Sequence, residues 1–363
     1  MKMDVTKKKI LNGYHVIFLV QNIMIGMGLL SISNSMSPVG YSQWWFPILF
    51  GIIANITLIP MIWLALQYRD DDLFDIHEKL LGKWIGKMLN SFLIIYATIL
   101  FAAVIQNYLD LVQISVLSER TITGHLLVII LMTVFIVKGG IKSLARFCIL
   151  TFVLALWMVY FLRWGIVDGE ISHLLPLFNF TGTEFWDATK KGYSSVVGYE
   201  VLMFFFPYIR QPEKAFKHAS FGIWITSIIY LAVTTVAVMY LTEWQIKHSL
   251  FPILKLFQAV ELSFIERIDT IGVAFWVFLI LTTAGAYLWV AKKGVDSVRN
   301  KNSQYHIYAV AILTYIIINL PMSQAMRKTL YENSFYVSYA LILWPILLSS
   351  IHLIRRKRDE VKK

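Results

Sequence analysis

The segment "GYSSVVGYEVLMFFFPYI", Gly192 to Ile209, is apolar enough to lie in a membrane, yet a glycine and a carboxylate stand inside it. Glycine lowers helix propensity by roughly 1 kcal/mol relative to alanine. A carboxylate near the middle of a span costs about 3 kcal/mol on insertion scales, and such residues usually face a cavity or a partner. We therefore expect a membrane span whose helix is interrupted at Gly198, with Glu200 turned towards protein or water.

The composition of the whole chain also predicts a membrane protein. Its 363 residues are 58% hydrophobic and 15% charged, and the mean hydropathy is +0.64. At roughly 20 apolar residues per helical span, the chain has room for about ten spans in one transporter-like domain. The formal net charge of +11 is better explained by charges that set membrane topology than by a nucleic-acid partner. We expect contact with the lipid bilayer and no binding of nucleic acid.

Apolar stretches mark the expected spans along the chain. They are Tyr14 to Ser35, Gln43 to Gln67, Asn90 to Gln113, His125 to Val137, Phe147 to Val167, Gly192 to Ile209, His218 to Leu241, Thr270 to Val290, His306 to Pro321 and Phe335 to Leu353. If the chain enters the first span from the cytoplasm, the cytoplasmic segments carry 24 of the 33 Lys and Arg residues and the outer segments carry 9. This bias predicts that both termini are cytoplasmic.

Two connections have apolar residues at helical spacing among charges. The inner segment Asp71 to Lys87 predicts an amphipathic helix lying on the membrane, and the outer segment Ser249 to Asp269 predicts a cap helix over the outer mouth. The alternative is that these segments are additional spans.

The first and sixth spans carry interruption signals at corresponding places in two halves, residues 10–167 and 190–355. Gly26 and Gly28 stand near the middle of the first span, as Gly198 does in the sixth. Paired interruptions of this kind are typical of transporters built as five-plus-five inverted repeats, in which broken helices meet at a solute site. The alternative is that each glycine only allows close helix packing.

The polarity of the half-helices predicts which ligand groups they would hold. Free amides near Met27, Gly28 and Leu29 form a helix N-terminus that could accept a carboxylate. Carbonyl ends near Gly26 and Val197 would suit an ammonium or a hydroxyl group.

Side chains on the other spans complete the expected ligand site. They are Tyr199 and Glu200 on the sixth span, Asn107 on the third and Thr283 on the eighth. Glu200 is expected to be functional or proton-linked, and could be neutral at pH 7 if it is buried without a cation. The alternative is a protonated structural hydrogen bond.

Several motifs together resemble one known family. They are "LFDIHEKLLGKWIGK" (Leu73 to Lys87), "HLLPLF" (His173 to Phe178), "GYE" (Gly198 to Glu200), "PYIRQPEKAFKHA" (Pro207 to Ala219) and "FPILKLFQAVELSFIERID" (Phe251 to Asp269). In this order they resemble the B subunits of bacterial spore germinant receptors, along almost the whole chain. That family is similar to the amino acid, polyamine and organocation transporters.

The resemblance implies an all-α protein with ten helices in an inverted repeat, with helices 1 and 6 interrupted. It also implies recognition of a small nutrient germinant in the inner membrane of the spore, together with A and C subunits. A proton-coupled amino-acid symporter, with Glu200 as proton carrier, is the alternative. No phosphate-cradling loop, ligand-spaced histidine set or nucleophile pair favours an enzyme or a cofactor.

Overall fold

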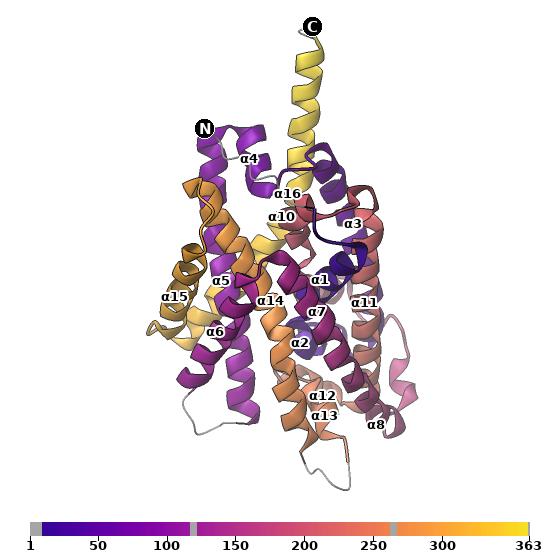
Figure 1. Ribbon diagram of the computed structural model, residues 1–363. Coiled ribbons are helices and arrows are strands. Elements are labelled where there is room, and N and C mark those ends of the chain that lie inside the picture. Colours follow the sequence, from indigo (N-terminus) through magenta and orange to yellow (C-terminus); the bar gives the residue numbers. More distant parts are fainter. Residues whose placement is uncertain (1–8, 117–121, 262–266, 362–363) are drawn as a thin grey trace.

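The computed structural model describes residues 9–116, 122–261 and 267–361, which form a bundle of helices (Figure 1). The principal helices are α1 (Gly13–Ile25), α2 (Gly28–Ser35), α3 (Phe46–Gln67), α5 (Lys83–Ser115), α6 (Thr123–Lys138), α7 (Ile141–Leu156), α11 (Ala215–Tyr240), α14 (Ile268–Arg299), α15 (Tyr305–Asn319) and α16 (Gln324–Val361). Within these described ranges, six helical stretches are long and apolar enough to cross a membrane, and α1 with α2 forms a seventh candidate as a bent pair.

Shorter helices connect or complete these elements. The short α-helices are α4 (Leu73–Leu81), α8 (Leu162–Val167), α9 (Gly182–Tyr193), α10 (Leu202–Phe205), α12 (Glu243–His248) and α13 (Leu254–Gln258). The 3-10 helices are η1 (Ser37–Trp45), η2 (Trp157–Phe161), η3 (Ile171–Leu174), η4 (Ser194–Val196), η5 (Tyr199–Val201), η6 (Phe206–Tyr208) and η7 (Pro212–Lys214).

The helices fall on the segments expected from hydropathy. The fourth and ninth segments, which are short in sequence, form the short apolar helices α6 and α15. The sixth segment is built from short pieces, with the end of α9 followed by η4, η5, α10 and η6. The expected fold class, an all-α membrane protein with the first and sixth helices interrupted, is confirmed, whereas the exact number of spans stays a prediction.

Helix α14 lies at the centre of the bundle and packs along α5 (Figure 1). Among the candidate spans α14 has the largest buried share and α16 the smallest. Other parts of the protein therefore surround α14, whereas most of the surface of α16 faces the outside of the bundle.

The start of the first interrupted span and the end of the second are joined by backbone hydrogen bonds. The amide of Leu11 donates to the carbonyl of Tyr208 at 2.9 Å, and the amide of Arg210 donates to the carbonyl of Leu11 at 3.0 Å. The segment before α1 is thus paired with the segment after η6, although about two hundred residues separate them in sequence.

Helix α4 forms within the segment Asp71 to Lys87, where an amphipathic helix was expected. It is amphipathic, and the carboxylate of Asp72 caps its first turn by accepting the amide of Asp75 at 3.2 Å. Its apolar side chains are buried, however, and Phe74 packs on Phe204 of α10 with ring centroids 4.9 Å apart. Protein therefore covers the apolar face and α4 docks onto the bundle, whereas its position at the membrane surface stays a prediction.

His77 fastens α4 to two of the principal helices. The indole of Trp344 on α16 donates to Nε2 of His77 at 2.8 Å, so that nitrogen is an acceptor. Nδ1 must then carry the hydrogen, which it donates to Oδ1 of Asn90 on α5 at 2.9 Å. Burial lowers the pKa of His77 to about 4, and the neutral imidazole fits both partners.

The expected cap helix over Ser249 to Asp269 is corrected. Its helical part among the described residues is α13 (Leu254–Gln258), and residues 262–266 lie outside the described ranges. Leu256 and Phe257 of α13 are buried, and the ring of Phe257 packs edge-on against that of Phe161, with the ring centroids 6.1 Å apart. In the described part of this segment, α13 packs on the bundle as a single helical turn.

Candidate functional site

The first interruption separates α1 from α2 at Gly26. The two helix axes are bent by 51°, and Gly26 has φ 27° and ψ −140°. This backbone conformation favours glycine, because a side chain would be strained at positive φ. The backbone amides of Met27, Gly28 and Leu29 have no acceptor among the described residues. The predicted helix N-terminus with free donors is therefore present.

The carbonyl groups at the end of α1 are largely occupied by side chains from other helices. The hydroxyl of Tyr230 on α11 lies 3.2 Å from the carbonyl oxygen of Met24 and 3.1 Å from that of Ile25. The indole of Trp276 on α14 donates to the carbonyl of Gly26 at 3.3 Å. The sequence predicted a carbonyl end here that would suit a ligand hydroxyl, and the protein supplies its own donors.

The second interruption lies between η4 and η5. Val197 is extended, and Gly198 follows with φ 134°, again a conformation that favours glycine. The carboxylate of Glu200 accepts the amide of Gly198 at 2.7 Å. Glu200 therefore caps the inner half of this span from within the protein. The carbonyl of Val197 accepts no hydrogen bond from the residues described.

The two interruptions are in direct backbone contact. A Cβ atom on Gly28 would overlap the backbone carbonyl of Ser195 in η4, and one on Gly198 would lie 2.8 Å from the carbonyl oxygen of Ile23 in α1. The Tyr230 hydroxyl also lies 2.7 Å from the Ser195 carbonyl oxygen, so it bridges both interruptions. Gly28 and Gly198 thus allow a close approach that no other residue type permits.

Glu200 is buried in a cluster of hydroxyl groups that the sequence analysis missed. It is 1% exposed, and the hydroxyls of Tyr96 on α5 and Tyr287 on α14 lie 3.4 and 3.3 Å from Oε1. Tyr96 also lies 2.7 Å from the hydroxyl of Ser338 on α16. Among the described residues, no Lys, Arg or His forms an ion pair with Glu200. Tyrosines inside apolar spans were the signal that could have identified this cluster.

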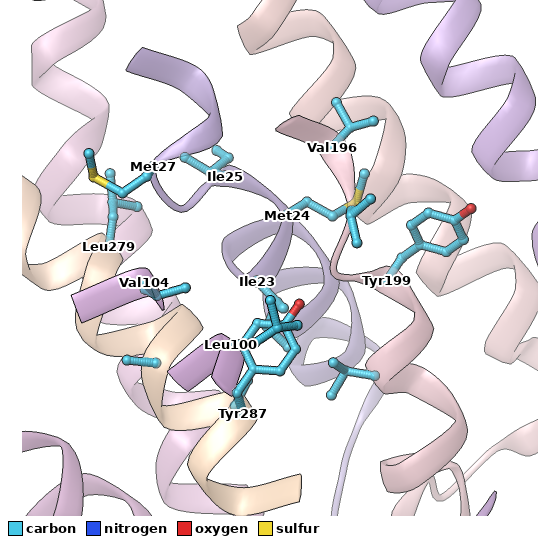
Figure 2. Packing of buried hydrophobic residues seen from close by; sticks show 14 of the residues in the cluster. Ile23, Met24, Ile25, Met27, Leu100, Val104, Val196, Tyr199, Leu279 and Tyr287 are labelled. Atoms are coloured by element: carbon cyan, nitrogen blue, oxygen red, sulfur yellow. The ribbon is translucent and has the colours of Figure 1, made fainter. Parts of the chain in front are cut away.

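The other predicted site residues are only partly brought together. Thr283 joins the first interruption, since its hydroxyl donates to the carbonyl of Asn22 at 3.3 Å. The side chain of Tyr199 points away from that interruption (Figure 2), and its hydroxyl lies 2.6 Å from that of Thr57 on α3. Asn107 is half-buried on α5, one turn beyond Val104, and has no hydrogen bond to either interruption within the described ranges.

Apolar side chains surround the space where the interruptions meet. Figure 2 shows Ile23, Met24, Ile25 and Met27 of the first interruption, Val196 of η4, Leu100 and Val104 of α5, and Leu279 and Tyr287 of α14. The amides of Met27, Gly28 and Leu29 and the carbonyl of Val197 are the backbone groups at the interruptions that make no hydrogen bond to the described residues. A small number of backbone donors and acceptors in an apolar surround is typical of small-molecule sites.

Comparison with known proteins identifies the family. The sequence profile described as spore germination protein matches residues 10–327, which is most of the chain. The chain belongs to the spore germination protein family. It is 25% identical to spore germination protein GerQB of Bacillus cereus over 94% of this chain and 97% of that one. It is 24% identical to spore germination protein A2 of Bacillus subtilis (strain 168) over 96% of each.

The fold of this spore germination protein resembles those of solved transporters. Mhp1, a nucleobase-cation-symport-1 family transporter solved with bromovinylhydantoin bound, has a TM-score of 0.63 at 12% identity, over 93% of this chain and 78% of Mhp1. MhsT, solved with L-phenylalanine, has a TM-score of 0.59 at 14% identity, over 91% of this chain and 86% of MhsT. These likenesses support the expected inverted-repeat architecture.

Proposed function

We propose that this chain is the nutrient-sensing subunit of a spore germinant receptor, and that it binds a small polar solute, an amino acid, where the two interrupted helices meet. The observation that carries this proposal is the set of unpaired amides at Met27, Gly28 and Leu29 in a buried, mostly apolar surround. A helix N-terminus with free amides and positive dipole is suited to a carboxylate.

The remaining groups fit the other end of an amino acid. The unpaired carbonyl of Val197 lies at the second interruption and would accept a hydrogen bond from an ammonium group. The apolar side chains around both interruptions would surround the rest of the solute. Trp276 already donates to the carbonyl of Gly26, so the ligand need not compensate that group. The single hydroxyl of Tyr230 is shared among the neighbouring carbonyls of Met24, Ile25 and Ser195.

The proposed signal follows from the contact between the interruptions. A ligand that binds one arrangement of α2 and η4 better than another shifts the bundle towards that arrangement. In a receptor, A and C subunits would read the shift in the inner membrane of the spore, with both termini of this chain in the cytoplasm. The names of the relatives, all spore germination proteins, support this assignment over a metabolic permease.

A proton-coupled amino-acid symporter is the second candidate, and Glu200 is the observation that favours it. A buried carboxyl group within a span, surrounded by tyrosine hydroxyls and without a basic partner in the described structure, could carry a proton. The symporter and the receptor would share one ligand site. They differ in whether the ligand crosses the membrane.

Uptake and equilibrium binding of labelled amino acids, sugars and nucleosides, measured on vesicles containing only this protein, separate the candidates. Saturable binding without uptake supports the receptor. Uptake driven by a proton gradient and abolished in Glu200→Gln establishes the symporter instead. If no labelled solute binds, the ligand site itself is wrong.

The variant Met27→Pro tests the site directly. Met27 has φ −77°, which proline can adopt, so the substitution removes one of the three amides with little strain. We expect binding to weaken about tenfold or more, as for a lost hydrogen bond to a charged group. Met27→Ala keeps the amide and shortens the side chain. If ligand affinity fell equally in Met27→Pro and Met27→Ala, the amide of Met27 would not contact the ligand.

A further inference from the structure

A polar cavity opens at the outer end of the interrupted helices, on the side opposite α4. Its volume is about 380 Å³, and six elements line it: the end of α2, the start of η1, the end of α9, the start of η4, α12 and α16. This cavity is separate from the apolar space in which the two interruptions meet. None of the motifs singled out in the sequence accounts for it.

Three lysines converge on this cavity from two helices. Lys190 and Lys191 end α9, and Lys247 ends α12. Lysines in a last turn stabilise the C-terminus of a helix. Helix stabilisation explains each lysine alone, but it does not explain why two separate helices end at one cavity.

The positive charge of the cavity is only partly neutralised. Lys191 forms an ion pair with Asp187 at 2.9 Å. The ammonium of Lys190 lies 4.9 Å from the ring centroid of Tyr336, a cation–π contact that leaves its charge in place. Lys247 has no ion pair in the described part of the chain. Glu243, one turn before it, instead accepts the amide of Tyr41 at 3.2 Å.

Hydroxyl groups in the cavity divide into two sets. Ser194 and Tyr339 donate to the carbonyls of Lys191 and Lys190 at 2.6 and 2.7 Å, and so hold the end of α9 in place. The hydroxyls of Ser35 and Ser37 make no hydrogen bond to other described residues and are free to donate. Ammonium groups together with free hydroxyl donors are suited to an oxyanion.

We infer that this outer cavity binds an anion carrying carboxylate or phosphate oxygens, held by Lys190, Lys247 and the hydroxyls of Ser35 and Ser37. The site goes beyond the proposed ligand site, and either can exist without the other. Ser35 ends α2, and Lys190 lies in the last turn of α9, which leads into η4, so an anion here contacts the ends of both interrupted spans. Occupancy of the cavity is thereby linked to the position of those helices.

The test is equilibrium binding of labelled inorganic phosphate to the full chain in vesicles of neutral lipid. We expect saturable binding that weakens about tenfold or more in the double variant Lys190→Gln, Lys247→Gln. Lys255→Gln on α13 removes a charge outside the cavity lining and should leave the affinity unchanged. Unaltered thermal unfolding of the double variant shows that the loss is local.

Two results would overturn the inference. One is the absence of saturable binding to the unaltered protein, and the other is an equal loss in the double variant and in Lys255→Gln. A second arm identifies the source of the anion by adding phosphatidylglycerol to the vesicles. Displacement of phosphate in proportion to this lipid shows that a headgroup reaches the cavity, whereas unchanged phosphate binding shows that a dissolved anion is held. Both results support the anion site.

Discussion

A single hydroxyl group, that of Tyr230, lies within hydrogen-bond distance of carbonyl oxygens from both interrupted helices. It has one hydrogen and three neighbouring acceptors, at Met24, Ile25 and Ser195. The hydroxyl is therefore shared, and each carbonyl depends on it for compensation inside a buried region.

Tyr230→Phe should destabilise the protein by about 1–3 kcal/mol, because buried carbonyls lose their donor. Thermal unfolding of the detergent-solubilised protein measures the effect. Tyr240→Phe on the same helix is the matched control, since the Tyr240 hydroxyl makes no hydrogen bond to the described residues. Equal melting temperatures for the two variants would show that Tyr230 does not hold the interruptions together.

At the residue scale, the sequence predicted the glycines at the interruptions but not the side chains that donate hydrogen bonds there. Gly26 and Gly198 were identified because glycine and polar residues are unusual in an apolar span, and both have positive φ. Tyr230, Trp276 and Tyr287 were missed, because tyrosine and tryptophan in membrane helices are common at interfaces and periodicity does not show which carbonyl each one reaches.

At the scale of single elements, α4 is held by a histidine that must stay neutral. Protonation would place a hydrogen on Nε2 of His77, facing the indole N–H of Trp344. Two donors cannot share that position, and the charge would be buried. Docking of α4 therefore depends on pH.

We expect α4 to lose docking stability as the pH falls below about 6.5 towards 4. The pKa of His77 is about 4 in the docked state and near 6.5 when exposed, so the undocked state binds more protons in this window. The docking free energy of α4 falls by about 3 kcal/mol across this pH window. Above the window, this contribution to docking is fully present. Hydrogen exchange of the α4 amides measures the change.

His77→Gln is the informative variant, because an amide can donate to Asn90 and accept from Trp344 without titrating. In this variant, the docking stability of α4 measured by hydrogen exchange should be nearly independent of pH. His125→Gln alters an exposed histidine on α6 and should keep the pH dependence. Persistent pH dependence in His77→Gln would assign the effect to another group.

The two amphipathic connections show what hydropathy leaves open. It gave the apolar face of α4 correctly, but a pattern on one helix does not say whether lipid or protein covers that face. Phe204 covers it here, and Phe204 is distant in sequence. The segment Ser249 to Asp269 has a similar pattern, yet in its described part α13 is a single turn that buries Leu256 and Phe257.

At the scale of the molecule, the order of apolar segments was enough to predict the all-α bundle and its two interruptions. How deeply each helix is buried in the bundle could not be predicted from the order of apolar segments. α14 and α16 have similar hydropathy, 2.0 and 1.9, yet α14 is central and α16 peripheral. Which helices surround α14 is set by tertiary packing, and hydropathy along one chain does not contain that information.

Orientation in the membrane can be tested with single cysteines, because the native Cys148 is fully buried. The Lys and Arg bias predicts that Asn302→Cys, between α14 and α15, reacts with an impermeant thiol reagent only from the cytoplasmic side. Thr183→Cys on α9 should react only from the outer side. Labelling of both from one side would contradict the predicted topology.

The glycine contacts also have a mechanical consequence. Backbone lies against backbone at Gly28 and Gly198, so little space separates the interrupted helices at these two positions. The pairing of Leu11 with Tyr208 and Arg210 adds a second fixed point at their inner ends. We therefore expect the two interrupted helices to move together, so that a tilt of α2 also displaces η4.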